Sequence, residues 1–199
     1  MEREQLLTGM VETSVKKERY ILVSVYAEDE DRAGALINEL SLLTETAGGE
    51  TVCKVMQHLE HPNPSTYIGK GKAEEISILV DELNADGIIC DDELTAVQIR
   101  NLSDILNIKV IDRTILILDI FASHARTAEG KLQVEMAQLE YRASHLAGIG
   151  KALSRLGGGI GTRGPGETKL ETDKRAIRKR LSSLRAEIKK LKESRNDVL

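Results

Sequence analysis

Residues 87–111 read GIICDDELTAVQIRNLSDILNIKVI, and this stretch decides the fold. It opens with the short apolar run GIIC and closes with IKVI, which both have the length and composition of buried strands. The segment between them, LTAVQIRNLSDILN, carries its apolar residues at helical spacing. A strand, a helix of about a dozen residues and a second strand make up the unit from which parallel sheets are built.

The same alternation extends on both sides of this unit. The stretches YILVSVYA (20–27) and TVCKVMQHL (51–59) are predicted strands. Predicted helices follow them at 31–49, closed by the glycine pair GG, and at 72–87, and TILILDIFASHA (114–125) is a further helix. We therefore predict an α/β fold with a small parallel sheet of about four strands, flanked by helices on its faces.

The hydrophobic pattern changes in the C-terminal part of the chain. Apolar residues recur four and three positions apart in two sets: Leu132, Met136, Leu139, Ala143 and Leu146, and then Ile177, Leu181, Leu184, Ile188 and Leu191. This spacing places each set on one side of a helix. We predict that the two helices pack seam to seam as a long antiparallel coiled-coil hairpin.

The second of these helices has a predicted start and length. Thr168 and Glu171 match a capping box, so the helix is expected to begin near Lys169. If it runs to about Lys192, its length is roughly 35 Å. The predicted domains are a lead-in at 1–19, a parallel α/β domain at 20–126, and the hairpin at 127–199 with a glycine-rich tip at 157–167.

Composition narrows the class of protein. No apolar run reaches the roughly 18 residues of a membrane span, and the glutamate-rich start is unlike a signal peptide, so we expect a soluble, cytoplasmic monomer. Cys53 and Cys90 form no C-x-x-C pair and are expected to be small buried thiols. His58 and His61 lack partner ligands, so no metal site is predicted.

The charge of the chain is unevenly distributed. Residues 151–199 hold 14 Lys and Arg against 6 Asp and Glu, a net charge of +8, whereas residues 1–150 have a net charge of −12. Such asymmetry is typical of proteins with nucleic-acid partners, although a basic tract is also a common solvated helix face. We take as candidate RNA-binding residues Arg155, Gly157, Gly158, Gly159, Gly161, Arg163, Gly164, Gly166, Lys169, Lys174, Arg175, Arg178 and Lys179.

The glycine-rich stretch LGGGIGTRGPGET (156–168) contains two patterns associated with nucleotide binding. Residues 159–164 match G-x-G-x-x-G, and residues 161–168 match a P-loop in which Glu167 replaces the essential lysine. Both patterns require a buried strand before them, whereas a helical segment precedes this stretch. Glycines and neighbouring cations suit close contact with RNA phosphates instead.

Two further clusters lie in the predicted α/β domain. Gly69, Lys70, Gly71 and Lys72 stand at a helix start and form a possible anion site, although such glycines also simply mark turns. Residues 91–93 (DDE) follow a strand, at a position where carboxylates can bind Mg²⁺ and where acidic residues also favour a helix start. These clusters support an alternative function, a nucleotide-binding or hydrolytic domain with its own ATP or GTP site.

A second alternative makes the hairpin a protein-docking or dimerisation module through its apolar seam. RNA recognition by base stacking is not expected, because aromatic residues make up only 3% of the chain. Salt dependence separates the two readings of the hairpin, since RNA binding weakens steeply with salt.

Three stretches together resemble the HflX family of ribosome-associated GTPases: YIGKGK (67–72), DRTILILDIFASHARTAEGKLQVEMAQLEY (112–141) and LSRLGGGIGTRGPGETKLETDKRAIRKRL (153–181). The resemblance implies a parallel α/β domain followed by a coiled-coil hairpin, which together bind the large ribosomal subunit and its rRNA. It places the hairpin tip, here residues 157–167, near the peptidyl transferase centre.

The resemblance also implies where the chemistry of such proteins lies. Members of the family use GTP and Mg²⁺ in a separate domain that follows the hairpin, and some split stalled or idle ribosomes into subunits. This sequence has no intact G-x-x-x-x-G-K-[ST], and no D-x-x-G or N-K-x-D in the positions that would follow. We therefore expect these residues to bind the ribosome and not to hydrolyse GTP.

Overall fold

A computed structural model describes the backbone of residues 17–156 and 165–196, and the side chains of residues 17–146 and 171–193. Its strands are β1 (Arg19–Tyr26), β2 (Glu50–His58), β3 (Gly87–Cys90) and β4 (Lys109–Asp112). Its helices are α1 (Glu30–Thr46), α2 (Lys70–Leu83), α3 (Ala96–Leu106), α4 (Arg113–His124), α5 (Ala128–Leu156) and α6 (Pro165–Asn196). The predicted alternation of strands and helices is confirmed.

The four strands form one parallel sheet in the order β2-β1-β3-β4. Side chains of β1 alternate between the two faces: Tyr20 and Leu22 pack on one side, Ile21 and Val23 on the other. All four are buried, because helices cover both faces of the sheet. This explains why the central strands read as nearly continuous apolar runs in the sequence.

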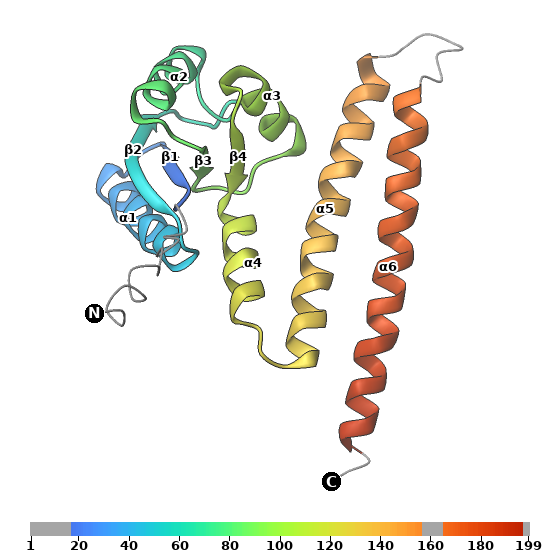
Figure 1. Cartoon of the computed structure of the whole chain (residues 1–199). Coiled ribbons are helices and arrows are strands. Elements are labelled where there is room, and N and C mark those ends of the chain that lie inside the picture. Colours follow the sequence, from blue (N-terminus) through green and yellow to red (C-terminus); the bar gives the residue numbers. More distant parts are fainter. Residues whose placement is uncertain (1–16, 157–164, 197–199) are drawn as a thin grey trace, which may run out of the picture.

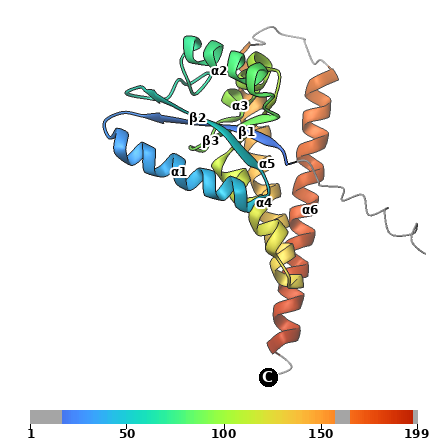
Figure 2. The same cartoon turned by 60° about the vertical axis from the view of Figure 1, so that its left-hand side comes forward.

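The helices divide between the two faces. α1 and α4 pack with the Leu22 side of the sheet, and α2 and α3 pack with the Ile21 side (Figures 1 and 2). Three of these helices have side-chain N-terminal caps, and Asp29 caps α1. Thr95 and Gln98 form a reciprocal capping box at the start of α3, and the Asp112 carboxylate accepts a hydrogen bond from the Ile115 N–H at the start of α4.

Helices α5 and α6 lie outside this layered domain and are called the arm below. α5 follows α4, and α6 lies beside α5 and runs in the opposite direction (Figure 1). Leu181, Leu184 and Ile188 of α6 are buried in this contact. Arg180 and Arg185 form ion pairs with Glu135 and Glu140 of α5, at 2.8 and 3.0 Å.

The predicted bounds of the second arm helix were wrong. α6 begins at Pro165 and not near Lys169, and its 32 residues make it about 48 Å long rather than 35 Å. Proline fits the first turn of a helix because its missing N–H has no partner there in any case. Thr168 therefore lies inside the helix, as do residues 165–167 of the predicted tip.

Among the described residues, every helix is too short or too polar to cross a membrane.

Candidate functional site

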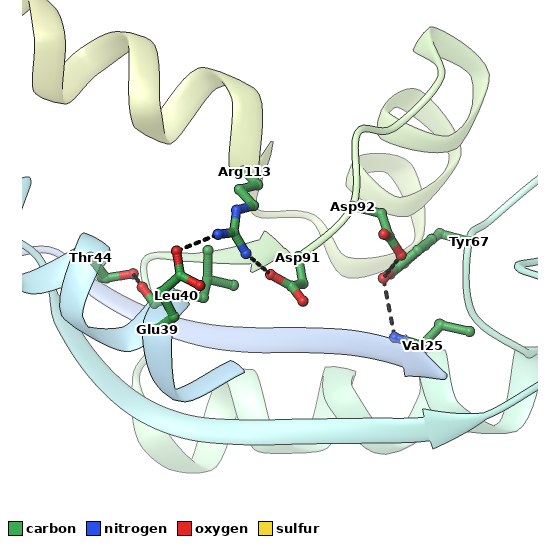
Figure 3. Close-up of polar contacts among 8 residues, drawn as sticks. All are labelled: Val25, Glu39, Leu40, Thr44, Tyr67, Asp91, Asp92 and Arg113. Carbon is green, nitrogen blue, oxygen red and sulfur yellow. Dashed lines mark hydrogen bonds and ion pairs between the residues drawn. The ribbon is translucent and has the colours of Figure 1, made fainter. Parts of the chain in front are cut away.

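The carboxyl ends of β1 and β3 form the natural ligand-binding position of this sheet. These neighbouring strands lead into α1 and α3, which cover opposite faces. In open α/β sheets, ligands bind where the connections diverge in this way. We use the word crevice below for this position at the strand ends, which side chains occupy in this chain. Figure 3 shows what fills it: Asp91 and Asp92 follow β3, with Arg113 on one side and Tyr67 on the other.

Arg113 holds one side of the crevice. Its guanidinium lies 2.9 Å from the Asp91 carboxylate and 2.6 Å from the Glu39 carboxylate of α1 (Figure 3). Asp91 is only 8% exposed. Burial raises the pKa of Asp91, and the hydrogen bond and charge of Arg113 oppose that rise. The arginine therefore counteracts the effect of burial on this carboxylate and joins α1, the end of β3 and α4.

Tyr67 holds the other side of the crevice. Its hydroxyl donates to Asp92 at 2.7 Å and accepts from the Val25 N–H at 3.1 Å (Figure 3). The ring is 1% exposed, and burial, together with the charges of Cys90 and Asp92, raises the pKa of the Tyr67 hydroxyl. The hydroxyl remains a neutral donor and ties the loop after β3 to the end of β1.

The chemistry of this crevice disfavours a nucleotide phosphate. The segment between β1 and α1 reads AED, without glycine, and the Asp29 carboxylate caps α1 where a phosphate would have to bind. Carboxylates surround Arg113 on both sides. The described residues contain no group of three or more His, Cys, Asp or Glu that could hold a metal ion.

The predicted anion site lies at the start of α2. Gly69 is the N-cap without a side-chain cap, and its own N–H donates to the Gln57 side chain at 2.9 Å. Lys72 is bound to Glu75 at 2.6 Å, and Lys70, with its side chain 91% exposed, lies 3.9 Å from Glu74. The backbone N–H groups in the first turn of α2, which includes Gly71, could thus bind an anion. Neighbouring carboxylates, however, already partly neutralise the charges of both lysines.

The predicted basic face on α6 is partly within the described residues. Arg175, Arg178 and Lys179 are exposed, Lys174 is half-buried, and among the described residues none of the four makes an ion pair. Arg180 differs, since Glu135 and Glu187 bind it. The four free cations are therefore available to an external anion.

The remaining predicted RNA-binding groups cannot be placed in the same way. Residues 157–164, with Gly157, Gly158, Gly159, Gly161, Arg163 and Gly164, lie outside the described residues. Arg155 is in the last turns of α5, and Gly166 and Lys169 are in the first turns of α6, but their side chains lie outside the described set. Their role stays a prediction.

Other residues considered from the sequence have structural partners. His58 Nε2 lies 2.7 Å from the Ala27 carbonyl oxygen, and its ring packs edge-on against Tyr26. Cys90 is buried, as expected, and Cys53 is half-buried; both are free thiols.

Sequence reasoning missed Arg113 and Tyr67 as parts of the crevice. The signal for Arg113 was its position directly after a strand, next to a residue suited to cap the following helix.

Two family models match adjoining parts of the chain. One is described as "GTP-binding GTPase N-terminal" and matches residues 35–122, and the other is "GTP-binding GTPase Middle Region" and matches residues 124–198. A protein named GTPase HflX from Lacrimispora saccharolytica is 53% identical over 192 residues, which is 96% of this chain. The Escherichia coli protein of the same name is 41% identical over 179 residues.

The chain carries the N-terminal and middle regions of the HflX family. It spans 45% of the length of the Lacrimispora HflX and 42% of the Escherichia coli HflX. The crevice described above is thus a feature of the N-terminal region of an HflX-type chain, and the arm is its middle region.

Solved structures agree on the fold. A crystal structure of SsGBP with GDP superposes with a TM-score of 0.63 at 22% identity, covering 90% of this chain and 46% of that one. A second structure, of a Sulfolobus solfataricus GTP-binding protein with GDP, gives a TM-score of 0.58 at 22% identity. The fold of this chain is therefore shared with structures that are only 22% identical to it in sequence.

Proposed function

We propose that this chain is the ribosome-binding part of an HflX-type GTPase and that it docks on the large ribosomal subunit and its rRNA. The arm, acting as a coiled-coil hairpin over residues 127–199, reaches the RNA, and the α/β domain over residues 20–126 carries and orients it. GTP hydrolysis with Mg²⁺ belongs to the part of the relatives that this chain does not cover. The whole protein then acts in the cytoplasm as a ribosome-splitting or ribosome-rescue factor.

The free cations of α6 carry this proposal. Arg175, Arg178 and Lys179 are exposed, and none of them forms an ion pair with a described carboxylate. Elsewhere on α6, Arg180 and Arg185 are used to bind glutamates of α5. One set of cations on α6 thus pairs with α5. A second set has no such partner and can bind phosphates.

The packing of α6 supports an arm that acts as a unit. Leu184 is fully buried, and Leu181 and Ile188 are 8% exposed. The apolar seam is therefore used within the chain, and this disfavours the alternative in which the same seam forms a dimer or docks a protein.

The acidic crevice and the partly neutralised Lys70 and Lys72 likewise disfavour a nucleotide site in the α/β domain.

Co-sedimentation with purified large and small ribosomal subunits tests the proposal. The chain should bind the large subunit selectively, and binding should weaken as salt increases. Arg178→Glu should weaken binding and lower the slope of log K against log salt by about one, because one phosphate contact is lost. The matched control is Arg32→Glu, the same charge change at an exposed position on α1.

The results separate the alternatives. Equal effects of the two substitutions would mean that net charge alone acts, and equal binding to both subunits would remove the claim of large-subunit docking. Binding that is indifferent to salt would point to a protein partner instead.

A further inference from the structure

The buried Asp112 carboxylate connects the α/β domain to the arm. Asp112 ends β4 and is fully buried. One of its oxygens accepts from the Ile115 N–H at 2.9 Å, and the other accepts from the Leu94 N–H at 3.0 Å and the Tyr141 hydroxyl at 2.8 Å. A single carboxylate therefore links β4, the start of α4, the loop after β3 and α5.

His145 makes a second link one helical turn further along α5. Its Nε2 lies 2.8 Å from the Leu94 carbonyl oxygen, which only accepts, so the imidazole donates there. The rings of Tyr141 and His145 stack, with centroids 4.0 Å apart and an angle of 28° between their planes. Both backbone polar groups of Leu94 are thus committed to this group of three side chains, which we call the joint.

Burial makes the joint sensitive to the loss of a donor. Burial, and then the hydrogen bond to Asp112, raises the pKa of the Tyr141 hydroxyl, which therefore remains a donor. Asp112 itself is fully buried, and a buried carboxylate that loses one of its donors is less well compensated. The hydrogen bonds of the joint consequently favour one orientation of α5 relative to the sheet.

Beside the joint, the arm and the α/β domain do not pack continuously. A groove of about 650 Å³ lies there, bordered by Ile99 and Arg100 of α3, Val110 of β4, Leu146 of α5 and Ile177 of α6. The groove leaves room for the arm to change direction if the hydrogen bonds of the joint are removed.

We infer that Asp112, Tyr141 and His145 are positioning residues that fix the direction of the arm relative to the sheet, and that this fixed direction is needed for docking. The inference rests on the proposed function, in which the arm contacts rRNA while the α/β domain orients it. The three residues act through the arm and make no contact with RNA themselves.

Spin-label distances measured in the whole chain test the joint directly. Labels are placed at Glu45 of α1 and Lys190 of α6, both exposed, in a Cys53→Ser background in which Cys90 is buried and unreactive. The test variant is Tyr141→Phe with His145→Leu. The matched control is Tyr26→Phe with His58→Leu, which alters another tyrosine and histidine in ring contact, far from the arm.

The joint variant should broaden or shift the distance distribution, and the control should leave it unchanged. Tyr141→Phe alone, which removes one hydroxyl and keeps the ring stack, should give a smaller change in the same direction. Circular dichroism confirms that each variant is folded. An unchanged distribution in the folded double variant would overturn the inference.

Large-subunit binding by the same variants tests the second half of the inference. The joint variant should bind about tenfold more weakly than the control. The loss of one or two hydrogen bonds that fix the direction of the arm corresponds to a change of this size. A moved arm with unchanged binding would overturn the need for a fixed direction. If the native chain itself failed to bind, both the proposed function and the requirement of a fixed arm direction for docking would be rejected. The distance measurement would still decide whether the joint fixes the arm.

Discussion

At the scale of single residues, Arg113 has the clearest energetic role. It is 24% exposed as a side chain and bridges the buried Asp91 and the more exposed Glu39. Removing one partner of a buried ion pair costs much more than the pair contributes, because the remaining charge stays buried without compensation. Arg113 is therefore needed mainly because Asp91 is buried.

Arg113→Met should lower the free energy of unfolding by about 3 kcal/mol at neutral pH. Burial already raises the pKa of Asp91 against the influence of Arg113, so losing the arginine raises that pKa further. Folding then favours the protonated acid, and stability is lost as the pH rises through the raised pKa of the folded state. Urea unfolding should thus show a larger deficit at pH 7 than at acidic pH, for example about pH 4.5.

Arg100→Met is the matched control. Arg100 forms an exposed ion pair with Asp104 at 3.7 Å, so its loss should cost roughly 0.5 kcal/mol or less with little pH dependence. Equal losses for the two variants, or a deficit for Arg113→Met that does not change with pH, would contradict this account.

The sequence predicted where Asp91 lies but not what it meets. Asp91 directly follows β3 and Arg113 directly follows β4, 22 positions later. They become neighbours because Cys90 pairs with Asp112 in the parallel register of these strands. The contact is thus a consequence of strand order and register, which depend on long-range packing and are not visible in local patterns.

At the scale of elements, the alternation of short apolar runs and helical periods was enough to predict every strand and helix of the α/β domain. The start of α6 was not predicted, because two local signals compete within a few residues. Thr168 and Glu171 favour a start near Lys169, whereas Pro165 favours a start at its own position, where α6 begins. The joint was also missed, since Tyr141 and Asp112 meet only when α5 packs on the end of β4.

The seam of α6 should dominate the stability of the arm. Leu184→Ala should cost about 3 kcal/mol, because Leu184 is fully buried and its removal leaves a cavity. Leu191→Ala, the same change at a position that is 38% exposed, should cost roughly 1 kcal/mol or less. Thermal unfolding followed by circular dichroism measures both.

Similar costs at the two leucines would mean that α6 is not held along this seam. An increase in the mass of the native chain with concentration, abolished by Leu184→Ala, would instead favour the dimerisation alternative, which predicts that this leucine faces a second copy.

At the scale of the whole molecule, charge and architecture divide the chain in the same way. Residues 1–150 carry a net charge of −12 and include the whole sheet, whereas residues 151–199 carry +8 and include all of α6. A molecule with an acidic body and a basic arm should approach a polyanion with its arm leading, because the polyanion repels the body and attracts the arm. The direction of the arm, set at the joint, then determines which surface the body meets.

Site-directed photo-crosslinking tests whether α6 contacts rRNA when the chain binds the large subunit. A photoreactive amino acid is placed at Lys179 on the open face of α6 and, separately, at Glu82 on α2, both exposed positions. Each chain is then irradiated with large ribosomal subunits. Crosslinks from position 179 to rRNA are expected, and they should be lost at high salt. Crosslinks from position 179 to ribosomal proteins alone would contradict contact between α6 and rRNA. The absence of crosslinks from position 179, with crosslinks from position 82 to rRNA, would contradict it as well.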